Sequence, residues 1–130
     1  MSSMQEDIKK RIKEAVSAIP EGYLTDLVIK ETVRCVLFGI LKQQGLVPVP
    51  AYRNPRFQEG PVDIAGMKDD KTMAIAFCSN PTIELNDIKR LERVDCDKKF
   101  VISFSRDQKK VKQSTFFLKP GIEHIGIHDK

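Results

Sequence analysis

The chain has 130 residues, of which 41% are hydrophobic and 31% are charged, and its formal net charge is +4. This length is typical of one domain that buries about two thirds of its unfolded surface. No apolar run approaches the roughly 18 residues of a membrane span, the charged N-terminal stretch lacks the apolar core of a signal peptide, and three scattered cysteines exclude a disulfide framework. We therefore expect an intracellular, cytoplasmic protein with reduced thiols.

The first third of the chain predicts two helices. Apolar residues recur at helical spacing over 4–19 and again over 26–44. Asp26 is a suitable N-cap for the second helix, and Gly45 is a suitable stop at its end. The second helix has apolar residues on two opposite faces, which predicts that it is buried between other layers.

Glu31 lies in the middle of one of these apolar faces. The other members of this face are Leu24, Leu27, Val28, Cys35 and Phe38. A carboxylate among apolar neighbours needs a cation, a hydrogen-bond donor or a raised pKa. An ion pair with Arg34 or with a lysine from elsewhere meets this need, and a role in holding a metal or a water molecule is the alternative.

The periodicity changes after residue 45. Residues 46–53 are extended, and their two prolines exclude a place at the centre of a sheet. The stretches 61–67 and 72–79 predict two strands, and 68–71 predicts a tight polar turn between them.

The remainder of the chain predicts a further helix and three strands. Residues 82–94 have the pattern of a short amphipathic helix, and 98–105 form the most apolar strand. The basic stretch 106–113 is a short helix or a loop, and 114–120 and 122–127 are expected to be the last two strands. This order predicts a single-domain α/β fold in which helices flank one mixed sheet.

Four features of this order resemble the PD-(D/E)xK nuclease-like superfamily, which includes restriction endonucleases and archaeal Holliday-junction resolvases. They are Glu31 in the helix before the sheet, Asp63 in GPVDIAG, the hairpin leading to MAIAFCSNP, and the helix and strand in LNDIKRLERVDCDKKFVISF. The resemblance covers residues 26–105 and implies a restriction-endonuclease-like fold. It also implies that Asp63, together with Glu31, binds Mg²⁺ for metal-assisted hydrolysis of DNA.

The same resemblance places Ala76 and Cys78 where the family has a carboxylate and a lysine on the third strand. The family's two groups lie two residues apart because alternate residues of a strand share a face. Loss of such preorganised charge costs about 10²–10³ in rate for each group. We therefore expect a degenerate site that does not cleave DNA efficiently. The alternative is an active magnesium-dependent endonuclease in which Glu84 and Lys89 of the following helix replace the missing pair.

Two basic segments are candidates for binding nucleic acid. In AYRNPRF, Arg53 and Arg56 lie beside Tyr52 and Phe57, which offers forks for phosphate and rings for stacking. The second segment contains Arg106, Lys109, Lys110 and Lys112. No base-reading motif accompanies them, so we expect recognition of the DNA backbone or shape, although a solvated surface has the same composition.

These features leave three functions open. The first is a nuclease-like protein with a degenerate site that binds DNA or a partner, and the second is the active endonuclease. The third is an assembly or scaffolding module that uses an exposed strand edge without nucleic acid. The family resemblance also implies a homodimer. In each case residues 1–130 are expected to form one domain, with an N-terminal helix in 1–22, the nuclease-like core in 26–105, and the basic segment and last strands in 106–130.

Overall fold

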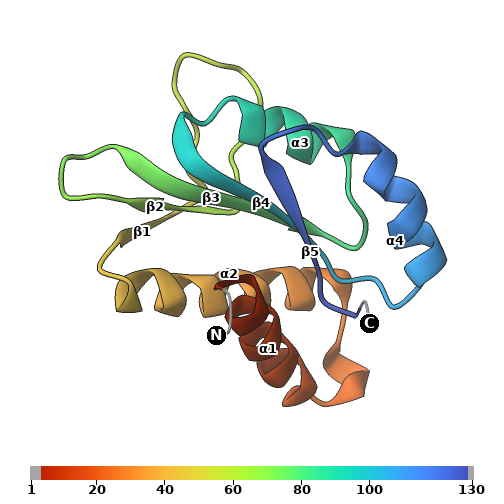
Figure 1. The fold of residues 1–130 in the computed structure, drawn as a ribbon. Helices are drawn as coiled ribbons and strands as arrows, with labels where there is room; N and C mark the ends of the chain where they lie inside the picture. Colours follow the sequence, from red (N-terminus) through yellow and green to blue (C-terminus); the bar gives the residue numbers. More distant parts are fainter. Residues whose placement is uncertain (1–3, 129–130) are drawn as a thin grey trace.

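The computed structural model describes residues 4–128 of the chain. Within these residues, five strands form one sheet in the order β1-β2-β3-β4-β5 (Figure 1). They are β1 (Val47–Pro50), β2 (Ile64–Met67), β3 (Met73–Asn80), β4 (Cys96–Ser103) and β5 (Ile122–Gly126). β2 is antiparallel to both β1 and β3, whereas β3, β4 and β5 are parallel. The sheet is therefore mixed, as the predicted α/β fold class requires.

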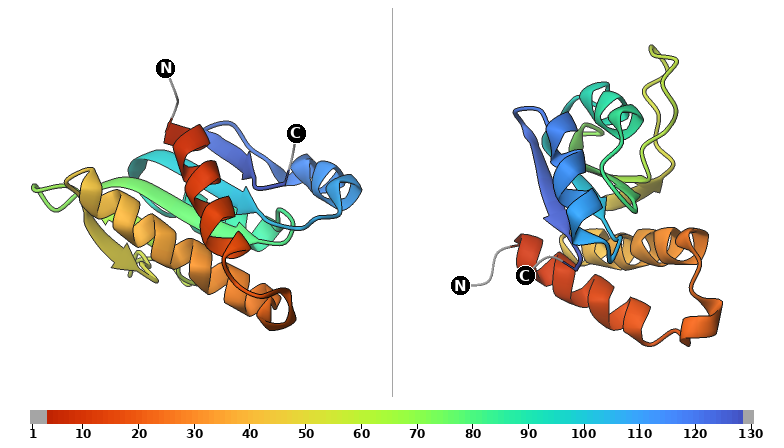
Figure 2. Two further views of the ribbon diagram at one scale, coloured as in Figure 1. Left: turned by 90° about the horizontal axis from the view of Figure 1, so that it is seen from below. Right: turned by 90° about the vertical axis from the view of Figure 1, so that its right-hand side faces the viewer.

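Helices cover both faces of the sheet. The helices are α1 (Met4–Ser17), α2 (Asp26–Gln43), α3 (Leu85–Glu92) and α4 (Gln108–Ser114). Figure 2 shows α1 and α2 on one side of the sheet and α3 on the other. Two short 3₁₀ helices, Glu21–Tyr23 and Thr115–Phe117, complete the regular structure of the described residues.

The apolar run of β3 is explained by this layering. Ile75 and Phe77 face the cluster beneath α1 and α2, whereas Ala76 and Cys78 face the cluster beneath α3. A strand covered on both faces has no solvated side, so its sequence is nearly continuous in apolar residues instead of alternating. The turn before β3 is closed by a hydrogen bond of 2.8 Å from the Lys68 N–H to the Thr72 carbonyl, which confirms the predicted hairpin.

The limits of α2 agree with the predicted helix to within one residue. The N-cap is Thr25 and not Asp26, because the Thr25 hydroxyl accepts a hydrogen bond of 3.1 Å from the Val28 N–H. At the other end, Gly45 has φ +81°, the left-handed conformation that glycine adopts without steric cost.

Two predictions of secondary structure and burial are wrong. The second apolar face of α2 is not covered, since Leu27 is 68% exposed and Phe38 is 39% exposed. Residues 114–120 do not form a strand. The hydroxyls of Ser114 and Thr115 bond to carbonyls one turn earlier, each at 2.6 Å, and these bonds continue the helical path beyond α4.

No helix between residues 4 and 128 is both long and apolar enough to cross a bilayer.

Candidate functional site

Asp63 lies at the end of the sheet where the carboxyl termini of β3 and β4 are found. β2 runs opposite to β3, so the residue that precedes β2 lies beside the last residues of β3. The Asp63 N–H donates a hydrogen bond of 2.9 Å to the Phe77 carbonyl, which fixes this position. Ligands of open α/β sheets bind outside the carboxyl ends of the strands. Asp63 is therefore at the end of the sheet where a ligand-binding site is expected.

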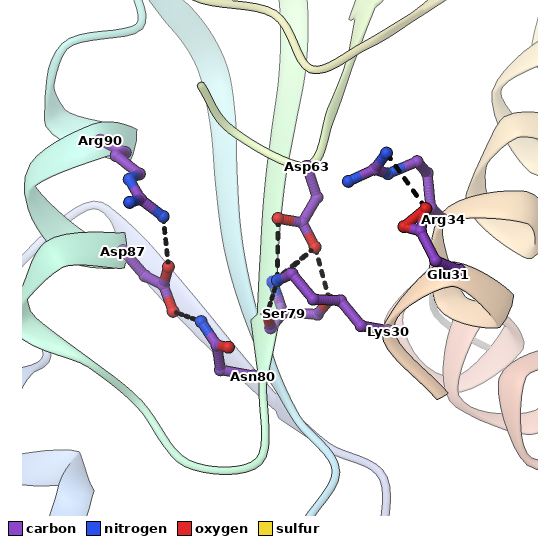
Figure 3. A network of polar contacts seen from close by, with 8 residues as sticks. All are labelled: Lys30, Glu31, Arg34, Asp63, Ser79, Asn80, Asp87 and Arg90. Atoms are coloured by element: carbon purple, nitrogen blue, oxygen red, sulfur yellow. Dashed lines mark hydrogen bonds and ion pairs between the residues drawn. The ribbon is translucent and has the colours of Figure 1, made fainter. Parts of the chain in front are cut away.

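The Asp63 carboxylate is held by Lys30 of α2 and Ser79 of β3 (Figure 3). Nζ of Lys30 lies 3.1 Å from Oδ1 and 3.0 Å from Oδ2, and it also donates to the backbone carbonyl of Ser79. Ser79 donates to Oδ2 from its backbone N–H at 3.2 Å and from its hydroxyl at 2.6 Å. The Asp63 side chain is only 6% exposed and the Lys30 side chain is 25% exposed, so a buried carboxylate pairs with a partly buried ammonium.

A second buried carboxylate, Asp87 of α3, has polar contacts of its own. Its side chain accepts a hydrogen bond from the Asn80 amide, and Nη1 of Arg90 lies 3.5 Å from Oδ1. Burial raises the pKa of Asp87, while the Asn80 hydrogen bond and the charge of Lys30 oppose this rise. Among the residues drawn in Figure 3, no hydrogen bond or ion pair joins these contacts to those of Asp63, Lys30 and Ser79, and the two groups interact through charge.

The two residues of α3 predicted to complete the site do not contact Asp63. Glu84 is the exposed N-cap residue of this helix and Lys89 is exposed, so neither side chain is among those that hold Asp63. Asp87, by contrast, is fully buried. A signal for it existed, because Asp87 lies four residues before the buried Leu91 and so shares its helix face.

Glu31 forms the expected ion pair with Arg34 but is not buried among apolar neighbours. Its side chain is 47% exposed, and its carboxylate pairs with Arg34 at 3.3 Å on the surface of α2. The apolar face around it is open to solvent, so the carboxylate needs no buried partner. The ion-pair interpretation is therefore confirmed. Lys30, the preceding residue, is the one that reaches Asp63, and no spacing in the sequence indicates a partner 33 residues away.

The side chains of Ala76 and Cys78 on β3 belong to buried apolar packing. Ala76 and Cys78 are both 0% exposed and face the cluster beneath α3. Burial, together with the negative charges of Asp87 and Asp63, raises the pKa of the Cys78 thiol far above its usual range. The thiol stays neutral near pH 7, which makes it a packing group and not a nucleophile.

The residues of this network do not fit a magnesium ion. Both oxygens of Asp63 contact the Lys30 ammonium, and the Phe77 carbonyl accepts the Asp63 N–H. The described residues contain no group of three or more histidine, cysteine or acidic side chains arranged to hold a metal. Magnesium needs near-octahedral oxygen ligation, so an ion at Asp63 would have to displace Lys30.

The predicted basic residues lie on two separate segments, the loop at the upper left of Figure 1 and the α4 segment at the right. The loop of residues 51–63 follows β1 and carries Arg53 and Arg56, and the segment around α4 follows β4 (Figure 1). The second segment carries Arg106, Lys109, Lys110 and Lys112. All six side chains are exposed, and Arg106 also lies 3.4 Å from Glu21.

The rings of the first segment do not provide open stacking faces, contrary to expectation. Tyr52 packs against the cluster beneath α3. The Arg93 guanidinium lies over the Phe57 ring, 4.7 Å from its centroid, and Arg93 Nε also contacts Glu59 at 2.7 Å. These contacts tie the loop to the end of α3 and leave its two arginines as the groups that face solvent.

Comparisons with known proteins give one weak likeness. Neither a protein-family model nor a curated protein matches the sequence. Among solved structures, the chain is similar to a repair endonuclease from Pyrococcus abyssi, with 15% identity and a TM-score of 0.43 over 82% of this chain and 49% of that chain. The chain thus spans about half the length of that nuclease. The similarity is to a nuclease, as the sequence resemblance predicted, but a TM-score this low carries no argument about activity or substrate.

Proposed function

We propose that the chain is a nuclease-like domain that binds the sugar–phosphate backbone of DNA and does not cleave it. The observation that carries this proposal is the state of Asp63, the residue to which the resemblance assigns metal binding. Its carboxylate is neutralised by Lys30 and accepts two hydrogen bonds from Ser79. Metal-assisted hydrolysis needs a carboxylate that is free to bind a cation.

The distribution of basic side chains supports the DNA-binding half of the proposal. The six exposed arginines and lysines lie on the two segments that follow β1 and β4. Exposed cations of this kind neutralise phosphates and release counterions, which gives affinity without base recognition. The net charge of +4 is in accord with a polyanionic partner.

Binding and cleavage are tested together with a fluorescent DNA duplex. We expect binding that weakens steeply as salt rises, and an intact duplex after incubation with Mg²⁺ or Mn²⁺. Charge reversal of Lys109, Lys110 and Lys112 should weaken binding and reduce the salt dependence. Reversal of Lys71 and Lys98, which are exposed near the opposite ends of the strands, is the matched control and should leave affinity nearly unchanged.

The two alternatives give different results in the same experiment. Metal-dependent cleavage that Asp63→Asn abolishes would establish the active endonuclease. Absence of DNA binding at low salt would favour the third function, the assembly or scaffolding module. One structural feature disfavours that module at the β1 edge, because Pro48 and Pro50 lack the N–H groups with which an added strand would pair.

A further inference from the structure

We propose that Phe116 is a stacking platform for an unpaired base of single-stranded DNA, and that the lysines on the same side of α4 hold the neighbouring phosphates. This inference rests on the proposed function, because it names the form of DNA that the domain selects and the residue that selects it. The rings expected to stack on bases, Tyr52 and Phe57, are covered by other side chains. Phe116 offers the open ring that they do not.

The exposure of Phe116 is the first observation. Phe116 lies in the 3₁₀ helix that follows α4 and is 86% exposed, more than any other large hydrophobic side chain between residues 4 and 128. The ring of Phe117 meets it in an edge arrangement, with the two centroids 5.7 Å apart. Most of the apolar surface of Phe116 is therefore in water, and a flat partner that covers the ring would gain free energy from its burial.

The charge around Phe116 indicates the chemistry of that partner. Residues 108–120 contain four lysines and no acidic residue. Side chains three and four positions apart are neighbours on a helix surface, so Lys109, Lys112 and Phe116 lie along one side of the helical path. All three are exposed, whereas Val111 and Ser114 on the other side are buried. A polyanion with flat apolar faces matches this surface, and a nucleic-acid strand has both features.

The chemistry of a phenyl ring favours an unpaired base over a duplex. In a duplex, each base is stacked between its neighbours and presents only its edges in the grooves, where it is recognised mainly through hydrogen bonds. A phenylalanine side chain has no hydrogen-bond donor or acceptor with which to read those edges. The bases of a single strand have open faces, and stacking on a ring tolerates any sequence. Phe116 therefore discriminates between forms of DNA and not between sequences.

The backbone beneath Phe116 is held in place before any ligand binds. The Leu118 N–H donates a hydrogen bond of 3.0 Å to the Thr115 carbonyl, which closes the turn around Phe116. The Ser114 hydroxyl accepts a hydrogen bond of 3.0 Å from the Ile83 N–H, and Phe117 packs against the cluster beneath α3. A platform that is already ordered loses little conformational entropy on binding, which favours affinity.

The first test compares a single strand of about 16 nucleotides with the duplex of the same sequence at one salt concentration. We expect Phe116→Ala to weaken binding of the single strand about tenfold and to change duplex affinity less than twofold. Phe116→Tyr, which keeps the ring, should retain single-strand affinity. Because Phe116 is so exposed, these substitutions leave the core intact.

The second test uses fluorescence. The chain has no tryptophan, so Phe116→Trp introduces a single indole whose emission a stacked base quenches. We expect quenching by the single strand and little by the duplex. Phe38→Trp is the matched control, because Phe38 is also an exposed ring with a lysine beside it, Nζ of Lys42 at 6.0 Å from the centroid. Phe38 belongs to α2, on the other face of the sheet, and a tryptophan there should not be quenched.

Three results would overturn the proposal. If Phe116→Ala leaves single-strand affinity unchanged while charge reversal of Lys109, Lys110 and Lys112 still weakens binding, the stacking role is wrong and the proposed function stands. An equal loss for strand and duplex would show that Phe116 is a wedge between paired bases. Absence of binding to either form overturns both proposals. In that case, a blue shift of the Phe116→Trp emission with anionic phospholipid vesicles would identify a membrane surface as the partner.

Discussion

Lys30 and Asp63 are 33 residues apart in the chain, yet the Lys30 amine lies within 3.1 Å of both carboxylate oxygens. This pair joins α2 to the residue that precedes β2, at the carboxyl end of β3 (Figure 3). This ion pair is the structural reason for proposing that the domain binds DNA without hydrolysing it, because the Asp63 carboxylate is already paired with a cation.

The energetic coupling of this pair is measurable by a double-mutant cycle. Lys30→Met should lower the free energy of unfolding by about 3 kcal/mol, because it leaves a buried carboxylate unpaired. Asp63→Asn should cost less, since the freed amine is already 25% exposed and can turn toward water. The double variant should lose about 1–3 kcal/mol less than the sum of the single losses in urea unfolding. Strictly additive losses would contradict a direct interaction.

A second prediction concerns Asp87 and pH. Its pKa is raised in the folded state, so the folded protein binds the proton more tightly than the unfolded chain does. Proton linkage fixes the sign: stability contributed by the protonated form is present below the unfolded value near 3.8 and is lost as pH rises through the higher folded value. Relative to Asp87→Asn, the natural protein should therefore lose stability as pH rises through this window.

Urea unfolding at a series of pH values measures this difference. Asp69→Asn, at an exposed position in the turn between β2 and β3, is the matched control. Its stability should parallel that of the natural protein across the whole series. If the stability of Asp87→Asn also follows that of the natural protein at every pH, the pKa of Asp87 does not differ between the folded and unfolded states. The expected linkage is then absent.

The position of Asp63 and the layering of β3 were predictable because both depend on local pattern. A lone carboxylate at the start of a strand and a run of apolar residues such as Phe77 are read directly from the chain. The partners of Asp63 were not predictable in the same way. Lysine is common on solvated helix faces, so nothing marks Lys30 as buried against a residue 33 positions away.

Two errors have a different origin, since they depend on what covers a surface. The second apolar face of α2 resembles a buried face, but no element of the described chain covers Leu27, and Glu31 is exposed with it. On α3, Asp87 interrupts an otherwise apolar helix face, whereas Glu84 and Lys89 are exposed. A carboxylate at a buried helix position is a stronger indication of a polar network than one on the exposed side.

The three cysteines should differ widely in reactivity. Cys35 is exposed and should be alkylated first in the folded protein at pH 8. Burial raises the pKa of Cys96 to about 11, so its alkylation should accelerate as pH rises toward that value. Cys78 should react only after unfolding, because its thiol is buried and neutral. Peptide mass spectrometry after iodoacetamide treatment gives the order, and rapid labelling of Cys78 in the folded protein would contradict its place under α3.

Two glycines provide a matched test of the packing between α2 and the sheet. A Cβ at Gly66 of β2 would lie 3.0 Å from side-chain atoms of Ile75, Leu41 and Leu46, whereas a Cβ at Gly39 of α2 would have no such atom within 4 Å. Gly66→Ala should therefore lower the free energy of unfolding by about 1–3 kcal/mol through overpacking between α2 and the sheet. Gly39→Ala should raise it by about 0.5–1 kcal/mol, because alanine loses less backbone entropy in a helix. Urea unfolding measures both changes. Equal effects of the two substitutions would show that α2 does not approach β2 as closely as these contacts require.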